Sequence, residues 1–394
     1  PEATRFAEEV LACLLVFLIS LSALAMLAMP LVIYILAPGF IDNPEKLDLT
    51  VQLTRIAFPY LTFMSLVALI GGILNSLHRF TAAAAAPIIL NIVLIAVLAF
   101  VLLSGWGAEP RPGFALVWGV SAAGLLQFIM LWTAMTRAGV SLKLKRPRIT
   151  PGVRRLVSLG IPGLIAGGIT QINLLVSTMI ASLQDSAPSW LYYADRIYQL
   201  PLGVIGIAIG VVLLPELSRR LRADDNDGVQ SSQNRALEIS MLLTIPSAVA
   251  LMAMPHPIIH VLFERGAFDA ADARATSVAL AAFAAGLPAF VMIKVFSPAF
   301  FAREDTRTPM WFALISVVIN IAGALALFPF IAYVGVALAT TAAGWVNALL
   351  LGYTLSKRGD FALDDRMRKA LPRIIAASLV MGFALLGVCL LYTS

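Results

Sequence analysis

Charged side chains are scarce in this sequence of 394 residues. Asp, Glu, Lys and Arg together make up 13% of it, whereas hydrophobic residues make up 60%. Soluble domains are about 25% charged and about 45–50% apolar. The scarcity of charge therefore excludes a soluble globular protein and predicts an integral membrane protein.

Cysteine and histidine are also rare. Cys13 and Cys389 both lie inside apolar stretches, where they offer neither a disulfide framework nor a zinc site. The pair His256 and His260 in "HPIIH" lacks the Glu that a zinc-protease motif requires after its first His. The acidic segment "ADDNDG" lacks the first and last carboxylates of a calcium loop, and no Gly-rich phosphate loop precedes a helix. We therefore expect no metal site and no cofactor.

Long apolar runs are what the sequence has in abundance. A helix needs about 20 mostly apolar residues to cross a bilayer, and eleven stretches separated by short linkers meet that requirement. The predicted spans are about 10–36, 51–77, 81–104, 114–136, 156–183, 190–217, 236–262, 275–300, 309–330, 333–355 and 372–392. The sequence thus predicts an all-α polytopic membrane protein.

The basic residues are unevenly distributed between the loops. When successive loops are assigned to alternate sides of a membrane, the N-terminal segment and the loops after the even-numbered spans hold 21 of the 28 Lys and Arg residues. This asymmetry follows the positive-inside rule and predicts that residue 1 lies on the cytoplasmic side. The most basic loop, 137–155, is then a topology determinant that touches anionic lipid rather than nucleic acid.

One apolar pattern occurs twice, as "ALAMLAMP" at 23–30 and as "AVALMAMP" at 248–255. Each copy leads to a turn that contains Gly and Phe, "LAPGFID" or "ERGAFDA", and then to another long span. Six predicted spans separate the two copies, so both cross the membrane in the same direction. This arrangement predicts a parallel repeat of six-helix units, as found in some secondary transporters.

The repeat also predicts how the chain is divided. Residues 1–140 would form an N-terminal lobe with the last four helices of one unit, residues 141–355 a C-terminal lobe with six helices, and residues 356–394 an additional, incomplete C-terminal helix. Because the sequence starts at Pro1 and stops directly after an apolar run, we expect a fragment that lacks two helices on its N-terminal side.

The candidate functional residues are the ionisable groups within the predicted spans, since a charge in the membrane is costly unless it is paired or faces water. Asp195 and Arg196 lie roughly 8–9 Å inward of Trp190 at 1.5 Å per residue. On a helix Asp195 reaches Gln199, and Arg196 reaches Tyr192. An arginine that faces a cavity suits phosphate or carboxylate. The alternative is a structural ion pair between helices.

Other polar residues in the spans are weaker candidates. Lys294 lies deep in its span and could face a cavity, whereas Arg55 lies near the outer end of its span, where it could reach the headgroups. Gln171 and Asn173 are uncharged, and they would suit hydrogen bonds between helices as well as contacts to a ligand.

One segment of the sequence is especially distinctive, "YYADRIYQLPLGVIGIAIGVVLLPELSR". Further distinctive segments are "APGF" (37–40), "LTRIAFPYLTFMSLVALIGGILNSLHRF" (53–80), "APIILN" (86–91) and "FSPAFFAREDTRTP" (296–309). With these segments the sequence resembles the MurJ/MviN family of lipid II flippases, and the first segment is similar to the signature helix of that family. The resemblance covers essentially the whole chain.

This resemblance implies a two-lobe, MATE-like transporter fold of fourteen helices, of which about eleven, the third to the thirteenth, are visible here. It implies that Arg196 contacts the substrate and that Asp195 orients or balances the neighbouring arginines, with Gln199, Lys294 and Arg55 as further binding candidates. Close relatives carry an acid at the position of Gln199, whereas the side chain in this sequence is uncharged. Spans 5, 9 and 10 contain no acid midway, which does not favour coupling to sodium.

The function implied by the resemblance is transport and not catalysis. A lipid II flippase moves the undecaprenyl-diphosphate-linked peptidoglycan precursor from the inner to the outer leaflet of the bacterial cytoplasmic membrane by alternating access. Its partners would be lipid II, membrane lipids and other cell-wall synthesis proteins. The alternatives are a polysaccharide-repeat flippase or a drug/cation antiporter of the same superfamily, a membrane enzyme acting on polyprenyl-diphosphate lipids, and a scaffold for wall synthesis.

Overall fold

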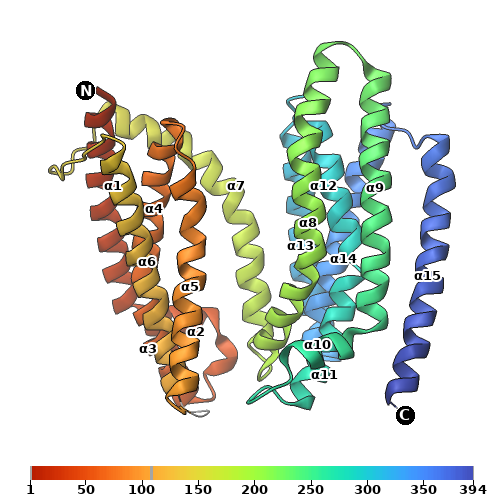
Figure 1. Ribbon diagram of the computed structural model, residues 1–394, viewed down its shortest axis with the longest axis horizontal. Coiled ribbons are helices and arrows are strands. Elements are labelled where there is room, and N and C mark those ends of the chain that lie inside the picture. The colour runs from red at the N-terminus through yellow and green to blue at the C-terminus, as the bar shows by residue number, and fades with distance from the viewer. Residues whose placement is uncertain (1, 107–109, 394) are drawn as a thin grey trace. The chain divides into compact units, whose positions relative to one another are not determined.

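The structure is a computed structural model that describes residues 2–106 and 110–393. The chain forms two compact units, Pro1–Ile165 and Ala166–Ser394, and the division falls inside helix α7 (Pro151–Ala181). Every regular element in the described residues is a helix (Figure 1). The all-α fold predicted from the sequence is confirmed.

Apolar helices of membrane-spanning length account for most of the described chain. Within the residues that the structure describes, nine helical stretches are long and apolar enough to cross a membrane. The two other predicted spans coincide with α7 and with α8 (Ala187–Arg222), which have 31 and 36 residues. Large apolar side chains cover the outside of these helices: Leu103 is 90% exposed and Phe330 is 84% exposed. Soluble proteins rarely expose such extended apolar surfaces, so this exterior is suited to lipid.

Unit 1 is built from helices that run alongside one another (Figure 1, red to yellow). Helix α4 packs between α1 and α6, and α5 packs mainly on α6. The elements of this unit that precede α7 are α1 (Glu2–Leu27), α2 (Met29–Leu36), the short 3-10 helix η1 (Pro38–Phe40), α3 (Pro44–Ala57), α4 (Pro59–Ser76), α5 (Thr81–Leu103) and α6 (Arg111–Arg137).

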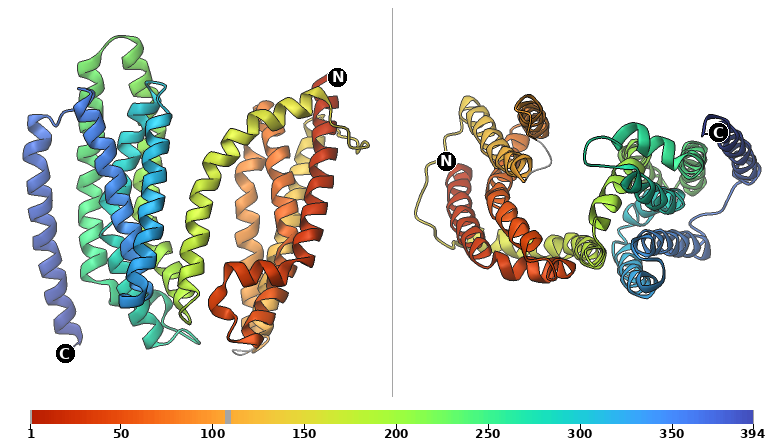
Figure 2. Two further views of the ribbon diagram at one scale, coloured as in Figure 1. Left: turned by 180° about the vertical axis from the view of Figure 1, so that it is seen from behind. Right: turned by 90° about the horizontal axis from the view of Figure 1, so that it is seen from below.

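Unit 2 contains the rest of α7 and eight further helices. Helix α8 packs against α9, α11 and α12, whereas α15 packs on α9 at the margin of the unit (Figure 2). The helices after α8 are α9 (Asn226–Ala253), α10 (Pro255–Phe263), α11 (Ala270–Ala284), α12 (Leu287–Phe301), α13 (Arg307–Ile331), α14 (Tyr333–Lys357) and α15 (Asp365–Thr393).

The internal repeat that the sequence predicts appears in the order of the elements. In each copy a long helix breaks at a Met-Pro pair: α1 gives way to α2 beside Pro30, and α9 gives way to α10 at Pro255. A proline ring blocks the hydrogen bond to the carbonyl four residues earlier. A Gly-Phe turn, a pair of consecutive helices, and two long helices follow in both copies. The series α1 to α6 and the series α9 to α14 therefore have the same succession of elements.

Small residues set how closely the helices of unit 2 approach one another. A Cβ on Gly344 of α14 would stand 2.9 Å from Cζ of Phe290 on α12, and one on Gly286 would stand 3.2 Å from Cα of Thr341. Distances this short leave no room for a side chain at either glycine. Without a hydrophobic driving force between helices in lipid, such close packing is a main source of their association.

A polar loop connects the last helix to the body of unit 2. The carboxamide nitrogen of Asn234 on α9 donates to the carbonyl of Ala362 at 2.8 Å, and Gln230 donates to the carbonyl of Gly359 at 3.1 Å. Arg366, in the first turn of α15, forms an ion pair with Glu238 of α9 at 3.0 Å. These contacts position α15 against α9.

Candidate functional site

Helix α8 carries the candidate site, and contacts at both of its ends fix its position. In its first turn, the indole nitrogen of Trp190 donates to Asp272 of α11 at 2.7 Å. Its last turn contains Arg219, Arg220 and Arg222, whose positive charge is favourable at the C-terminal end of a helix dipole. The site residues lie in the first third of α8, between these two anchored ends.

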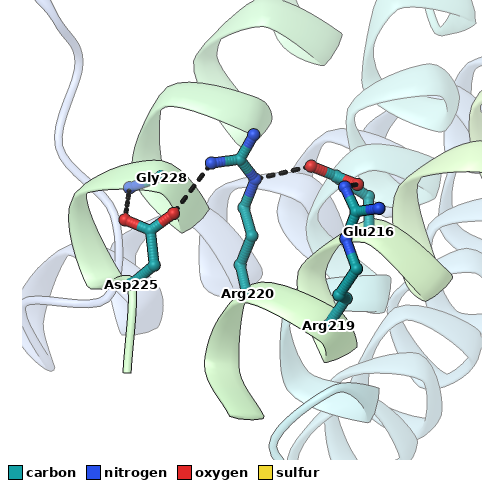
Figure 3. A network of polar contacts seen from close by, with 5 residues as sticks. All are labelled: Glu216, Arg219, Arg220, Asp225 and Gly228. Atoms are coloured by element: carbon teal, nitrogen blue, oxygen red, sulfur yellow. Dashed lines mark hydrogen bonds and ion pairs between the residues drawn. The ribbon is translucent and has the colours of Figure 1, made fainter. Parts of the chain in front are cut away.

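The last turn of α8 is braced by a network of polar contacts (Figure 3). Arg220 pairs with Glu216 at 2.5 Å and with Asp225 at 2.8 Å, and Asp225 accepts the N–H of Gly228 at 2.9 Å as the N-cap of α9. The N–H of Gly228 and the guanidinium of Arg220 lower the pKa of Asp225 below its ordinary value. The turn between α8 and α9 is therefore rigid at this end.

Arg196 lies on an exposed face of α8, and its guanidinium carbon is 4.7 Å from the centre of the Tyr192 ring. The predicted contact between these two residues is confirmed. A ring face attracts a cation without neutralising it. Within 2–106 and 110–393, no carboxylate lies at ion-pair distance from Arg196. Its charge is therefore held in place and remains available to an anion.

Asp195 faces a different direction from Arg196. Its carboxylate accepts a hydrogen bond from the carboxamide of Gln199, which confirms the predicted contact one turn along the helix. Among the residues that the structure describes, Asp195 forms no ion pair. The two charged neighbours thus interact with separate partners on α8.

Asp195 lines a cavity of about 680 Å³ that lies wholly within unit 2. The walls come from α7, α8, α11 and α14, and they combine aromatic rings with amide and hydroxyl groups. Tyr192 and Tyr198 of α8 line the cavity, as does Phe283 of α11. A cavity that is largely apolar with a few polar groups has the composition of a small-molecule site.

A buried group of hydrogen bonds forms part of the structure behind this cavity. The carboxamide nitrogen of Asn320 on α13 donates to Asn173 on α7 at 2.7 Å and to Ser177 at 3.3 Å. The oxygen of the same carboxamide accepts the hydroxyl of Thr340 on α14 at 3.1 Å. Asn320 is only 2% exposed. This amide joins the consecutive helices α13 and α14 to α7, which is far from them in the sequence.

Lys294 lies on the same side of α8 as Asp195, but at a different depth. The Cγ of Lys294 on α12 is 3.5 Å from the point where a Cβ on Gly206 would stand. Gly206 follows Asp195 by eleven residues, which is about three helical turns and a rise of about 16 Å. The two residues therefore lie on the same face of α8, about 16 Å apart along the helix. Lys294 is exposed and does not line the cavity.

Arg55 belongs to unit 1 and has a defined structural contact. Its Nε donates to the carbonyl of Met26 at 2.9 Å. That carbonyl would otherwise pair with the N–H of residue 30, but Pro30 has none. Arg55 therefore completes the hydrogen bonding at the break between α1 and α2.

The sequence indicated some of these groups and missed others. Asn173 stood out as a polar residue in an apolar span, and the structure places it both in the amide cluster and on the cavity wall. Tyr198, Ser177 and Thr340 gave no signal, because aromatic and hydroxyl side chains are common in membrane helices. For Asn320 the sequence offered one signal, namely that a polar amide stands within an apolar span.

These features define a class of protein. Repeated series of membrane-spanning helices, with polar groups and a cavity between helices, are characteristic of secondary transporters built from internal repeats. The family model described as "Lipid II flippase MurJ" matches residues 1–394. The chain belongs to this family.

Individual relatives agree with this assignment. The chain is 51% identical over 384 residues to the probable lipid II flippase MurJ of Rhizobium meliloti (strain 1021), a match that covers 97% of this chain and 72% of the relative. It is 36% identical over 380 residues to the probable lipid II flippase MurJ of Rickettsia prowazekii (strain Madrid E), with 96% and 74% covered.

Solved structures also match the fold. A lipid II flippase MurJ in an inward closed conformation superimposes with a TM-score of 0.83 at 26% identity, covering 97% of this chain and 77% of that one. An inward-facing multidrug resistance MATE family transporter of the MOP superfamily superimposes with a TM-score of 0.72 at 11% identity, covering 93% and 88%. The predicted MATE-like fold is confirmed.

Proposed function

We propose that this protein is a lipid II flippase, which carries the undecaprenyl-diphosphate-linked peptidoglycan precursor from the inner to the outer leaflet of the cytoplasmic membrane. The two relatives in sequence are named as probable lipid II flippases, and the solved structure with a TM-score of 0.83 is named as a lipid II flippase. The observation that carries the proposal is Arg196, a charged residue in a membrane-spanning helix that is held over the Tyr192 ring without a carboxylate partner in the described part of the chain.

In this proposal Arg196 binds the diphosphate. A guanidinium presents paired N–H donors in a plane, a geometry that matches two oxygens of a phosphate. Asp195 and Gln199 set the polarity beside it, because their mutual hydrogen bond places a carboxylate on the neighbouring face of α8. Lys294, about 16 Å along that face, is a weaker candidate contact. Arg55, in unit 1, is a separate and weaker candidate through its terminal nitrogens.

The membrane potential supplies a driving force for this movement. A diphosphate carries about two negative charges, and moving one elementary charge through 100 mV is worth about 2.3 kcal/mol. With the outside positive, the field favours outward movement of the anion. The basic residues of the N-terminal segment and the even-numbered loops orient the protein so that residue 1 faces the cytoplasm. An uncoupler is therefore expected to slow flipping.

The proposal is tested in cells depleted of their own flippase, with lipid II in the outer leaflet as the readout. Wild-type protein should restore it, and Arg196→Ala should not. Arg222→Ala is the matched control, because Arg222 is an exposed arginine at the end of the same helix that bonds only its own turn through Ser218. Equal flipping by wild type and Arg196→Ala at matched protein levels would overturn the role of Arg196. No flipping by the wild type would favour a related flippase for polysaccharide repeats.

A further inference from the structure

The cavity of unit 2, as lined by the described residues, contains no cationic side chain that would bind a diphosphate. Besides the carboxylate of Asp195, its polar lining consists of uncharged groups, among them the amides of Gln171 and Asn173 and the hydroxyls of Ser177 and Tyr198. Within the described residues, no group of His, Cys, Asp and Glu side chains is arranged to hold a metal ion. The cavity therefore suits an uncharged ligand that combines apolar surface with hydrogen-bonding groups.

Two neighbours of Arg196 on α8, Tyr192 and Asp195, line the cavity. Tyr192 lines the cavity and also carries the guanidinium of Arg196 over its ring, at 4.7 Å from the ring centre. Asp195, the neighbour of Arg196 in sequence, lines the cavity as well. A group attached to an anion on Arg196 would therefore lie beside Tyr192, at the edge of this cavity.

We propose that the cavity is the subsite for the sugar joined to the diphosphate of the lipid substrate, an inference that rests on the function proposed above. Sugar hydroxyls and acetamido groups both donate and accept hydrogen bonds, as the amides and hydroxyls of the lining do. The rings of Tyr198 and Phe283 offer apolar surface to the carbon skeleton. A volume of about 680 Å³ falls within the range of about 300–1,000 Å³ typical of small-molecule sites.

A substitution that fills the cavity should distinguish the contribution of the sugar to binding from that of the diphosphate. Leu174 lines the cavity and is 61% exposed, whereas its neighbour Leu175 is 44% exposed and does not line it. The variants Leu174→Trp and Leu175→Trp therefore make the same change at adjacent exposed positions. Tyr198→Phe is a milder variant, because it removes one oxygen from the lining and keeps the ring.

The ligands are undecaprenyl diphosphate and the same lipid carrying the N-acetylated disaccharide, each titrated into the protein in lipid nanodiscs. We expect Leu174→Trp to weaken binding of the sugar-bearing lipid about tenfold or more, a loss of about 1.4 kcal/mol, and to leave binding of the sugar-free lipid unchanged. Tyr198→Phe should weaken only the sugar-bearing lipid, by a smaller factor. Leu175→Trp should change neither, and Arg196→Ala should weaken both.

Two results would overturn the subsite. Leu174→Trp and Tyr198→Phe could bind the sugar-bearing lipid as tightly as wild type does, or they could weaken both lipids by the same factor. Failure of the proposed function gives a different result, since wild type would then bind neither lipid, or Arg196→Ala would bind both as wild type does.

Discussion

The hydrogen bond of Arg55 at the break between α1 and α2 allows a quantitative test of how this break is stabilised. The Nε of Arg55 satisfies the carbonyl of Met26 at 2.9 Å, at the place where Pro30 cannot donate. A hydrogen bond from a charged donor contributes about 1.5–3 kcal/mol. We therefore expect Arg55→Ala to lower the free energy of unfolding by about that amount. Arg79→Ala, which removes an exposed arginine in the turn between α4 and α5, should have little effect.

A double-mutant cycle with Pro30→Ala tests whether the missing N–H of Pro30 is the reason that Arg55 stabilises the fold. Alanine restores an N–H at position 30 that can donate to the carbonyl of Met26, so Arg55→Ala should cost less than about 1 kcal/mol in that background. The assay is reversible unfolding in mixed micelles, followed by circular dichroism, for the wild type, both single variants and the double variant. An equal cost of Arg55→Ala in both backgrounds would refute this explanation.

Three further changes test the packing and the electrostatics. Asn320→Ala removes three hydrogen bonds, each of which contributes about 0.6 kcal/mol in membrane proteins. It should therefore lower the free energy of unfolding by about 2 kcal/mol. Asn91→Ala, at an exposed position of α5, should leave that free energy unchanged. Gly344→Leu overpacks the contact between α12 and α14 and should cost about 1–3 kcal/mol, whereas Gly203→Leu enters open space; thermal unfolding compares the two. The N–H of Thr308 and the guanidinium of Arg358 lower the pKa of Asp305 from 3.8 to about 2. Its carboxylate therefore stabilises the fold above about pH 4, and that stabilisation is lost as the pH falls toward 2. Over that interval, thermal unfolding of the wild type should shift more steeply with pH than that of Asp305→Asn, and equal slopes would contradict the assignment.

Much of the fold could be predicted from the sequence, because the bilayer imposes strong constraints on it. Apolar runs of sufficient length predict helices, and the positions of Lys and Arg predict which loops share a side. The repeat was visible because a Met-Pro break and a Gly-Phe turn recur in the same order. The contacts between Arg196 and Tyr192 and between Asp195 and Gln199 were predictable as well, since neighbours one helical turn apart face each other.

The cavity and the amide cluster were beyond the reach of the sequence. Asn320 and Asn173 are separated by 147 positions, and no local pattern indicates that α13 packs against α7 at that depth. The role of Arg55 was also hidden, because its partner is a backbone carbonyl of another helix, and every residue carries one. Tertiary packing places these groups together, and a single sequence does not record it.

Flipping by the purified protein tests the central claim most directly. The protein is reconstituted into vesicles whose inner leaflet contains labelled lipid II, and the appearance of label in the outer leaflet is followed with time under an imposed membrane potential. We predict rapid transfer with the wild type, the same transfer with Arg222→Ala, and transfer with Arg196→Ala no faster than in vesicles without protein. Transfer by Arg196→Ala at the wild-type rate would contradict the claim that Arg196 binds the diphosphate, and an absence of transfer by the wild type would contradict the claim that this protein flips lipid II.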